Sequence, residues 1–159
     1  MPVDRPYIGP NDRERDRMRA VIEGLSDDDL RRAVNPDWTV AAVLGHLAFW
    51  DGRALALTEK LERGVPFSES DVEPEDVTWI NDATRPLLHA IPPREAATVA
   101  LRIAEETDRR VASLSPALAA RTWPDDQQSP LNPLRASHRS EHLDEIEAAL
   151  GGPRSQVER

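Results

Sequence analysis

The chain has 159 residues, a length typical of a single domain, and carries a formal net charge of −9. Such an acidic chain, without a run of lysine or arginine, is unsuited to the phosphate backbone of nucleic acids. It contains no cysteine, which excludes disulfides, thiolate metal sites and cysteine nucleophiles. Its first residues lack the apolar core of a signal peptide, and no apolar run approaches the ~20 residues that span a bilayer. We therefore expect a cytoplasmic protein that does not enter the membrane.

Helix signals recur along the chain, whereas strand signals are almost absent. The first helix is predicted to begin at Asn11, which forms a capping-box pattern with Glu14. A short helix is predicted after Ser26, because the three aspartates that follow suit the positive end of a helix dipole. Pro36 is predicted to end this segment.

The clearest helix is predicted to start after Thr39, a good N-cap residue, and to end at Gly64. Its apolar residues form one stripe along the helix: Val40, Val43, Leu44, Leu47, Trp50, Ala54 and Leu61. Asp51 falls close to this stripe. We expect it to have a structural role, paired with an arginine of the first helix.

The second half of the chain is predicted to contain an acidic loop, three helices and one proline-bearing connection. In chain order these are a loop over 65–77, a short helix over 78–90, a long helix over 94–114, a connection over 115–130 and a last helix over about 132–150. Antiparallel packing of the four longer amphipathic helices predicts an all-α bundle around one core. We expect one domain over 1–150, with Gly151 and Gly152 ending the last helix and 151–159 forming a disordered tail.

The segment HRSEH at 138–142 places two of the four histidines of the chain four residues apart. On a helix this spacing puts His138 and His142 on one face, ~40° apart. Apolar residues share that face, so we expect both rings to point into the bundle: Leu131, Leu134, Ile146 and Ala149. One divalent cation would satisfy both buried imidazoles. The alternatives are a pair that faces solvent, or a single histidine hydrogen-bonded in the core.

His46 strengthens the metal interpretation, because it lies on the helix over 40–63, on the flank of the apolar stripe. A bundle can bring this flank against the last helix. Three imidazoles would leave at least one ligand position open, as catalytic metals require, and Zn²⁺ or Ni²⁺ suits such ligands. His89 lies on a shorter helix beside Ile91-Pro92-Pro93, and we expect a surface or locally hydrogen-bonded role for it.

Two carboxylates are candidates for supporting roles on the last helix. Glu145 lies near the histidine face and can orient an imidazole by accepting its second N–H. Glu141 flanks that face and can act as a base, or can be a solvated charge paired with Arg135 or Arg139. The H-x-x-E-H protease pattern over 138–142 is interpreted as accidental, because only 17 residues follow to supply its third ligand.

Three segments carry a family resemblance: NPDWTVAAVLGHLAFWDGRALAL, the segment VTWINDA after the acidic loop, and SHRSEHLDEIEAAL. They resemble the DinB-like superfamily, which includes mycothiol-dependent maleylpyruvate isomerases and related bacterial thiol transferases, and the similarity extends from about 11 to 150. The resemblance implies an up-down-down-up four-helix bundle, in many members a homodimer. It also implies metal ligands at His46, His138 and His142.

The resemblance suggests a metal-dependent enzyme that transfers or isomerises a small molecule with the help of a small thiol. Because the chain lacks cysteine, that thiol must be a cosubstrate such as mycothiol or bacillithiol. Arg53, near the His46 side of its helix, is the candidate to bind a carboxylate of substrate or cosubstrate. Two alternatives stay open: a non-catalytic metal-binding or structural dimer, and a metal-dependent hydrolase.

Overall fold

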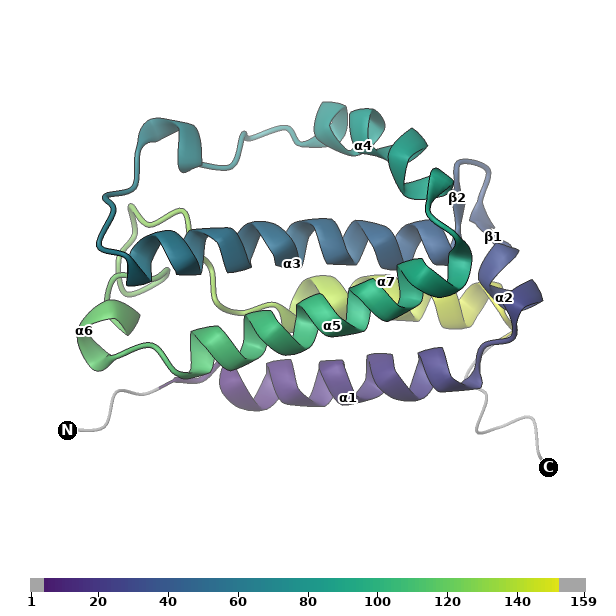
Figure 1. The fold of residues 1–159 in the computed structure, drawn as a ribbon, viewed down its shortest axis with the longest axis horizontal. Helices are drawn as coiled ribbons and strands as arrows, with labels where there is room; N and C mark the ends of the chain where they lie inside the picture. The colour runs from purple at the N-terminus through teal and green to yellow at the C-terminus, as the bar shows by residue number, and fades with distance from the viewer. Residues whose placement is uncertain (1–4, 152–159) are drawn as a thin grey trace.

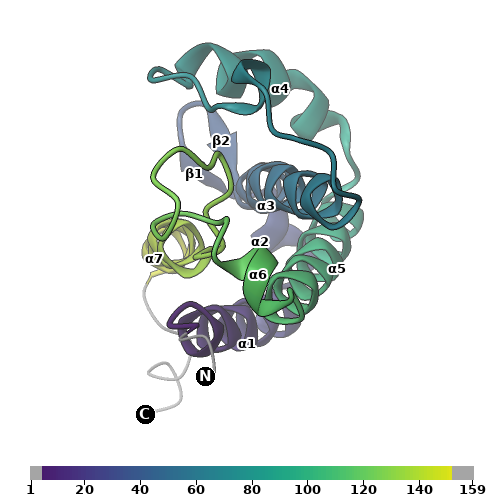
Figure 2. The ribbon, with the colours of Figure 1, turned by 90° about the vertical axis from the view of Figure 1, so that its left-hand side faces the viewer.

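The computed structural model describes residues 5–151 and is mostly helical. Its four long helices are α1 (Ile8–Gly24), α3 (Val40–Glu62), α5 (Pro93–Ala112) and α7 (Ala136–Ala149). The colours of Figure 1 show α1 and α7 running one way along the long axis, and α3 and α5 running the other way. The end-on view of Figure 2 shows the four helices around a common core. The predicted all-α fold is confirmed.

Shorter elements complete the chain and lie mainly at one side and at the ends of the four helices. They are α2 (Asp27–Arg31), β1 (Ala33–Asn35), β2 (Trp38–Thr39), the 3₁₀ helix η1 (Glu69–Asp71), α4 (Thr78–Ala90) and α6 (Pro116–Ala119). Figure 2 shows α4 outside the group of four, above α3. The strands β1 and β2 pair antiparallel as a small hairpin, which the sequence analysis did not predict.

Several helix ends follow from local chemistry. The hydroxyl of Thr39 accepts a hydrogen bond from the Ala42 amide, as an N-cap residue does. Ser26 and Asp29 form a reciprocal capping box at α2. Gly64 follows α3 with a φ of +72°, a conformation that favours glycine. The predicted caps at Ser26 and Thr39 and the glycine stop at Gly64 are confirmed.

The predicted N-cap role of Asn11 at the first helix is wrong, because α1 already begins at Ile8 and Asn11 is buried within it. The side-chain oxygen of Asn11 instead accepts hydrogen bonds from the amides of Arg135 and Ala136, at 2.8 and 2.9 Å. Its side-chain nitrogen donates to the Pro133 carbonyl at 2.8 Å. Asn11 therefore caps the start of α7, which begins at Ala136 and not near 132.

The apolar core centres on α3, most of which is buried against α1, α5 and α7. By length and composition α3 could cross a membrane, which the sequence analysis did not expect. However, 72% of its most apolar window is buried inside the fold, as in the core helix of a soluble protein. The tail over 153–159 and Gly152 lie outside the described residues, whereas Gly151, with a φ of +92°, follows the end of α7 as predicted.

A network of buried ions crosses the bundle. Arg139 on α7 has no exposed surface, and its Nε donates to Oδ2 of Asp51 on α3 at 3.0 Å. Both of its Nη atoms donate to the carboxylate of Asp108 on α5, at 2.8 Å each. Arg135 Nε donates to the other Asp51 oxygen at 2.9 Å. These ion pairs connect α3, α5 and α7 and fix their positions relative to one another.

This network corrects two expectations. Asp51 is structural, but its partners are Arg135 and Arg139 and not an arginine of the first helix. Arg139 lies in the core and does not pair with Glu141 at the surface. The most buried face of α7 holds Ala136, Arg139, Leu143 and Ile146. The histidines therefore lie on the flank of that face, turned toward α3.

Candidate metal centre

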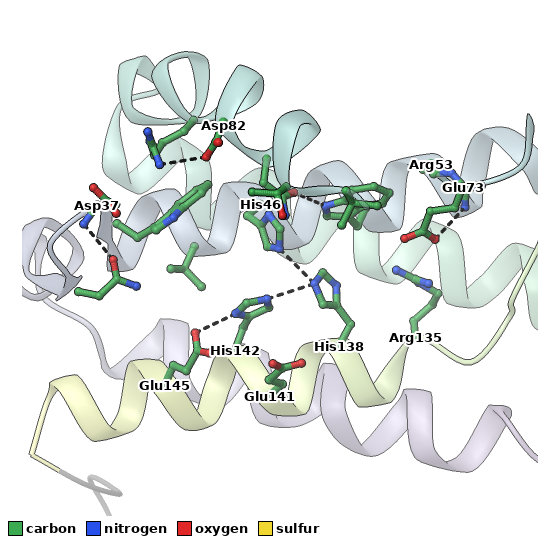
Figure 3. Close-up of a pocket in the computed structure, with 18 residues that line it drawn as sticks. Asp37, His46, Arg53, Glu73, Asp82, Arg135, His138, Glu141, His142 and Glu145 are labelled. Atoms are coloured by element: carbon green, nitrogen blue, oxygen red, sulfur yellow. Dashed lines mark hydrogen bonds and ion pairs between the residues drawn. The ribbon is translucent and has the colours of Figure 1, made fainter. Parts of the chain in front are cut away.

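The structure brings His46, His138 and His142 together. His46 lies in the first third of α3 and is 7% exposed, and the other two lie one turn apart on α7, half-buried. Nε2 of His138 lies 3.1 Å from Nε2 of His46 and 3.1 Å from Nε2 of His142. The potential ligand atoms of all three residues lie within 4.8 Å of one another (Figure 3).

The spacing of these nitrogens fits a shared divalent cation. Zinc–nitrogen bonds of ~2.0–2.1 Å at tetrahedral angles place neighbouring nitrogens about 3.3 Å apart. The observed separations of 3.1 Å are close to this value. Three converging Nε2 atoms cannot all be satisfied by hydrogen bonds to one another, because His138 carries at most one hydrogen there. One cation would satisfy all three, so the cluster can hold a metal ion.

The rings of His46 and His138 are held in the neutral form that ligates metals. Burial lowers the pKa of His46 to about 4, and the nearby His142 acts in the same direction. Burial lowers the pKa of His138 to about 3, assisted by the charges of His142, His46, Arg135 and Arg139. Both rings are therefore uncharged at neutral pH. Their Nδ1 atoms are buried and have no hydrogen-bond partner among the described residues.

The two carboxylates of α7 are placed differently. Oε2 of Glu145 accepts a hydrogen bond from Nδ1 of His142 at 3.0 Å, which leaves the lone pair of this ring on Nε2. Glu141 is exposed at the edge of the same cavity, and no described residue forms a hydrogen bond or ion pair with its carboxylate. It is therefore available to solvent or to a ligand.

The histidines lie in a cavity of about 710 Å³ between α3, α4, α7 and the β1–β2 hairpin. Trp50 on α3 donates its indole N–H to Oδ1 of Asn81 at 3.0 Å, which ties α4 to this side of the bundle. The ring of Trp38, from the hairpin, meets His46 edge-on with 5.6 Å between centroids. The cavity is large enough for a drug-sized molecule.

Arg53 lines the cavity, but its donors already have protein partners. Nη2 donates to the Asp71 carbonyl at 2.7 Å, Nη1 contacts the Pro130 carbonyl at 3.5 Å, and Nη1 lies 3.9 Å from the Glu73 carboxylate. These contacts hold the loop before α4 against α3. His89 lies outside this cavity and is exposed, and its Nδ1 bonds to the Arg85 carbonyl at 2.9 Å, which confirms the expected local role.

Two residues of the cavity wall were missed in the sequence analysis. Trp38 was not assigned a role, because the hairpin that carries it is too short to give a strand pattern. Arg135 was considered only as a surface partner of Glu141, whereas its side chain lies at the cavity beside Asp51. Its position three residues before His138, on the same side of the helix, was the available signal.

Comparison with known proteins agrees with this geometry. The family model described as the DinB superfamily matches residues 11–142, which include all three clustered histidines and the α4 segment. The chain shows no significant match to a curated protein or to a solved structure. The matched range covers most of the chain, so the protein belongs to the DinB superfamily.

Proposed function

We propose that His46, His138 and His142 hold a divalent cation, Zn²⁺ or Ni²⁺, and that the protein is an enzyme acting on a small molecule with a thiol cosubstrate. The observation that carries this proposal is the convergence of three Nε2 atoms on the wall of a 710 Å³ cavity. Three protein ligands leave at least one position for a further ligand, the arrangement found at catalytic metals.

When bound, such a cation would lower the pKa of a thiol that ligates it and so favour the nucleophilic thiolate. The chain has no cysteine, so the sulfur must come from a small molecule of the mycothiol or bacillithiol class. The reaction class is then S-transfer or isomerisation through a thiol adduct. A homodimeric, cytoplasmic protein is part of the same proposal.

The surrounding side chains have distinct roles in this proposal. Glu145 fixes the tautomer of His142 through its 3.0 Å hydrogen bond, so that Nε2 faces the cation. Glu141, whose carboxylate has no partner among residues 5–151, takes or returns a proton at the edge of the cavity. Arg53 keeps the loop before α4 in place and adds positive charge to the wall.

Two other functions use the same cluster. A non-catalytic metal-binding or structural protein would need the histidines but no open cavity. A hydrolase would use Glu141 as a base toward water instead of a thiol. The polar cavity beside the histidines favours a protein that takes a small-molecule ligand over a purely structural one.

The first test measures bound metal in protein purified without a histidine tag. We expect about one equivalent of divalent metal per chain. His46→Ala should lose it, whereas His89→Ala should retain it, because His89 is exposed and outside the cluster. Metal retained equally by His46→Ala would overturn the site.

The second test asks for the reaction. Metal-loaded protein is assayed for transfer of mycothiol or bacillithiol to a model electrophile, and for isomerisation of maleylpyruvate. Turnover that disappears in a folded His142→Ala variant would support the enzyme. Metal-loaded protein with no thiol-dependent turnover but with ester or amide hydrolysis would favour the hydrolase, and no turnover at all would favour the non-catalytic protein.

A further inference from the structure

Arg135 lies beside the histidine cluster in an unusual setting for an arginine. It immediately precedes α7, three residues before His138, and its side chain is only 14% exposed. Its Nε donates to Oδ1 of the buried Asp51 at 2.9 Å. This contact fixes one edge of the guanidinium against the bundle and directs the remaining edge away from Asp51.

The two Nη atoms of Arg135 have no protein acceptor. No described residue accepts a hydrogen bond from either of them, and neither is buried from solvent. Because Arg135 lines the 710 Å³ cavity, these donors are accessible from it. Arg53 differs, because Asp71, Pro130 and Glu73 already surround its donors. Arg85, the third arginine of the lining, lies on α4 and pairs with Asp82 at 3.3 Å. Arg135 thus combines unused donors with a position fixed beside the histidines.

The buried carboxylate that Arg135 contacts is shared with a second arginine. Asp51 pairs with both Arg135 and Arg139, and Asp108 pairs with Arg139 and Arg15. Arg15 pairs in addition with Asp12 at 3.0 Å. Of the two arginines that share Asp51, Arg135 is the one that lines the cavity, since Arg139 is wholly buried.

Two arginines lie at one end of the cavity. Figure 3 shows Arg53 and Arg135 beyond His138, with the Glu73 carboxylate between them. Glu145 and Asp37 lie toward the opposite end, past His142. A ligand that spans the cavity would therefore meet two arginines and one glutamate at one end and the histidine cluster in the middle.

We propose that Arg135 binds a carboxylate of the small-molecule substrate, and so selects carboxylic acids and sets their direction relative to the histidines. A carboxylate has two oxygens spaced to accept from an arginine edge, and such paired bonds are stronger than neutral ones. Asp51 pre-orients the guanidinium, which lowers the entropy lost on binding. The inference deepens the proposed function by naming its substrate class.

The test uses the full-length chain after treatment with a chelator, so that no bound cation attracts the probe. Benzoate is titrated against benzamide, its neutral counterpart of the same shape, and phenyl phosphate is the third probe. The indole N–H resonance of Trp50 reports binding by NMR, since Trp50 lines the cavity. We expect benzoate to bind at least about tenfold more tightly than benzamide, as for a charge-assisted pair.

The variant Arg135→Gln should abolish this preference while benzamide affinity changes little. Arg15→Gln is the matched control: Arg15 binds the same ionic network through Asp108 at 3.0 Å but does not line the cavity. If Arg135→Gln does not fold, Arg135→Lys carries the test, because it keeps the charge and loses the planar fork. We then expect at least about a threefold loss of benzoate affinity.

Equal binding of benzoate and benzamide by the unsubstituted protein would overturn the proposal, as would an unchanged preference in Arg135→Gln or in Arg135→Lys. Phenyl phosphate binding more tightly than benzoate, and depending on Arg135, would overturn the assignment to carboxylates. No metal or thiol enters this titration. A negative result in the turnover assays would therefore not change the outcome of this titration. The measurement of bound metal is also independent of the titration.

Discussion

The imidazole of His142 donates its Nδ1 hydrogen to Oε2 of Glu145 at 3.0 Å, between residues almost one turn apart on α7. This bond fixes which nitrogen of His142 carries the hydrogen, and it places the free lone pair toward His138. Of the three clustered histidines, His142 is the one whose Nδ1 has such a partner. We therefore expect Glu145 to be the carboxylate that influences the metal affinity of the cluster.

Replacing Glu145 by alanine should weaken metal binding without removing it. Loss of a carboxylate that orients a ligating histidine typically lowers metal affinity by about 10–100-fold. Competition with a chromogenic chelator would measure the change. Glu141→Ala is the matched control, because Glu141 lies on the same helix and lines the same cavity without bonding to a histidine. Equal losses in both variants would contradict the role of Glu145.

Metal removal should destabilise the fold by an amount set by mass action. At a free zinc concentration about 100 times the Kd, binding to the folded state alone adds about 2.7 kcal/mol to the free energy of unfolding. Denaturant titrations with zinc and with chelator would measure the difference. His138→Ala should show no difference, because both of the 3.1 Å nitrogen–nitrogen contacts in the cluster involve His138. A zinc-dependent gain of the same size in that variant would argue against the cluster.

The helices could be predicted from local periodicity, and the convergence of the three histidines from that periodicity together with the antiparallel packing of helices in a bundle. Thr39, Ser26 and Gly64 act within one turn of their own position, so their chemistry is visible in the sequence. His138 and His142 share a side by spacing alone. The pairing with His46 needed only the antiparallel packing of two amphipathic helices.

What the sequence did not reveal depends on contacts distant along the chain. Asn11 caps a helix that begins 125 residues later. Arg139 is charged, and charged residues are almost never fully buried unless they are paired. Its burial requires Asp51 and Asp108, which come from two other helices. The β1–β2 hairpin, finally, is too short for an alternating pattern.

Replacing Arg139 by methionine should be strongly destabilising. The substitution leaves Asp108 with Arg15 alone and Asp51 with Arg135 alone, in a largely apolar interior. Breaking a buried ion pair on one side costs about 3–5 kcal/mol. The control is Arg19→Met, because Arg19 forms an exposed pair with Glu105 and should cost about 1 kcal/mol or less. Urea denaturation would measure both, and similar small losses would show that the network contributes little.

The stability of the metal-free protein should fall as the pH is lowered from about 6.5 toward about 4. The pKa values of His46 and His138 are about 4 and about 3 in the folded state. Histidine in an unfolded chain titrates near 6.5. Between these values the unfolded chain binds protons that the folded chain does not, so protonation favours unfolding, by at most about 1.4 kcal/mol per pH unit for each histidine.

Carboxylates also titrate toward the acid end of this range, so the histidine contribution is isolated by comparing variants between pH 6.5 and 5. His46→Gln removes one buried titrating ring and should flatten the dependence of the unfolding free energy on pH. His89→Gln should not, because His89 is exposed and its ring already bonds to a backbone carbonyl. Parallel curves for His46→Gln and the unsubstituted protein would mean that His46 binds its proton as readily in the folded state as in the unfolded chain. That result would contradict the burial of a neutral His46 ring in the metal-free cluster.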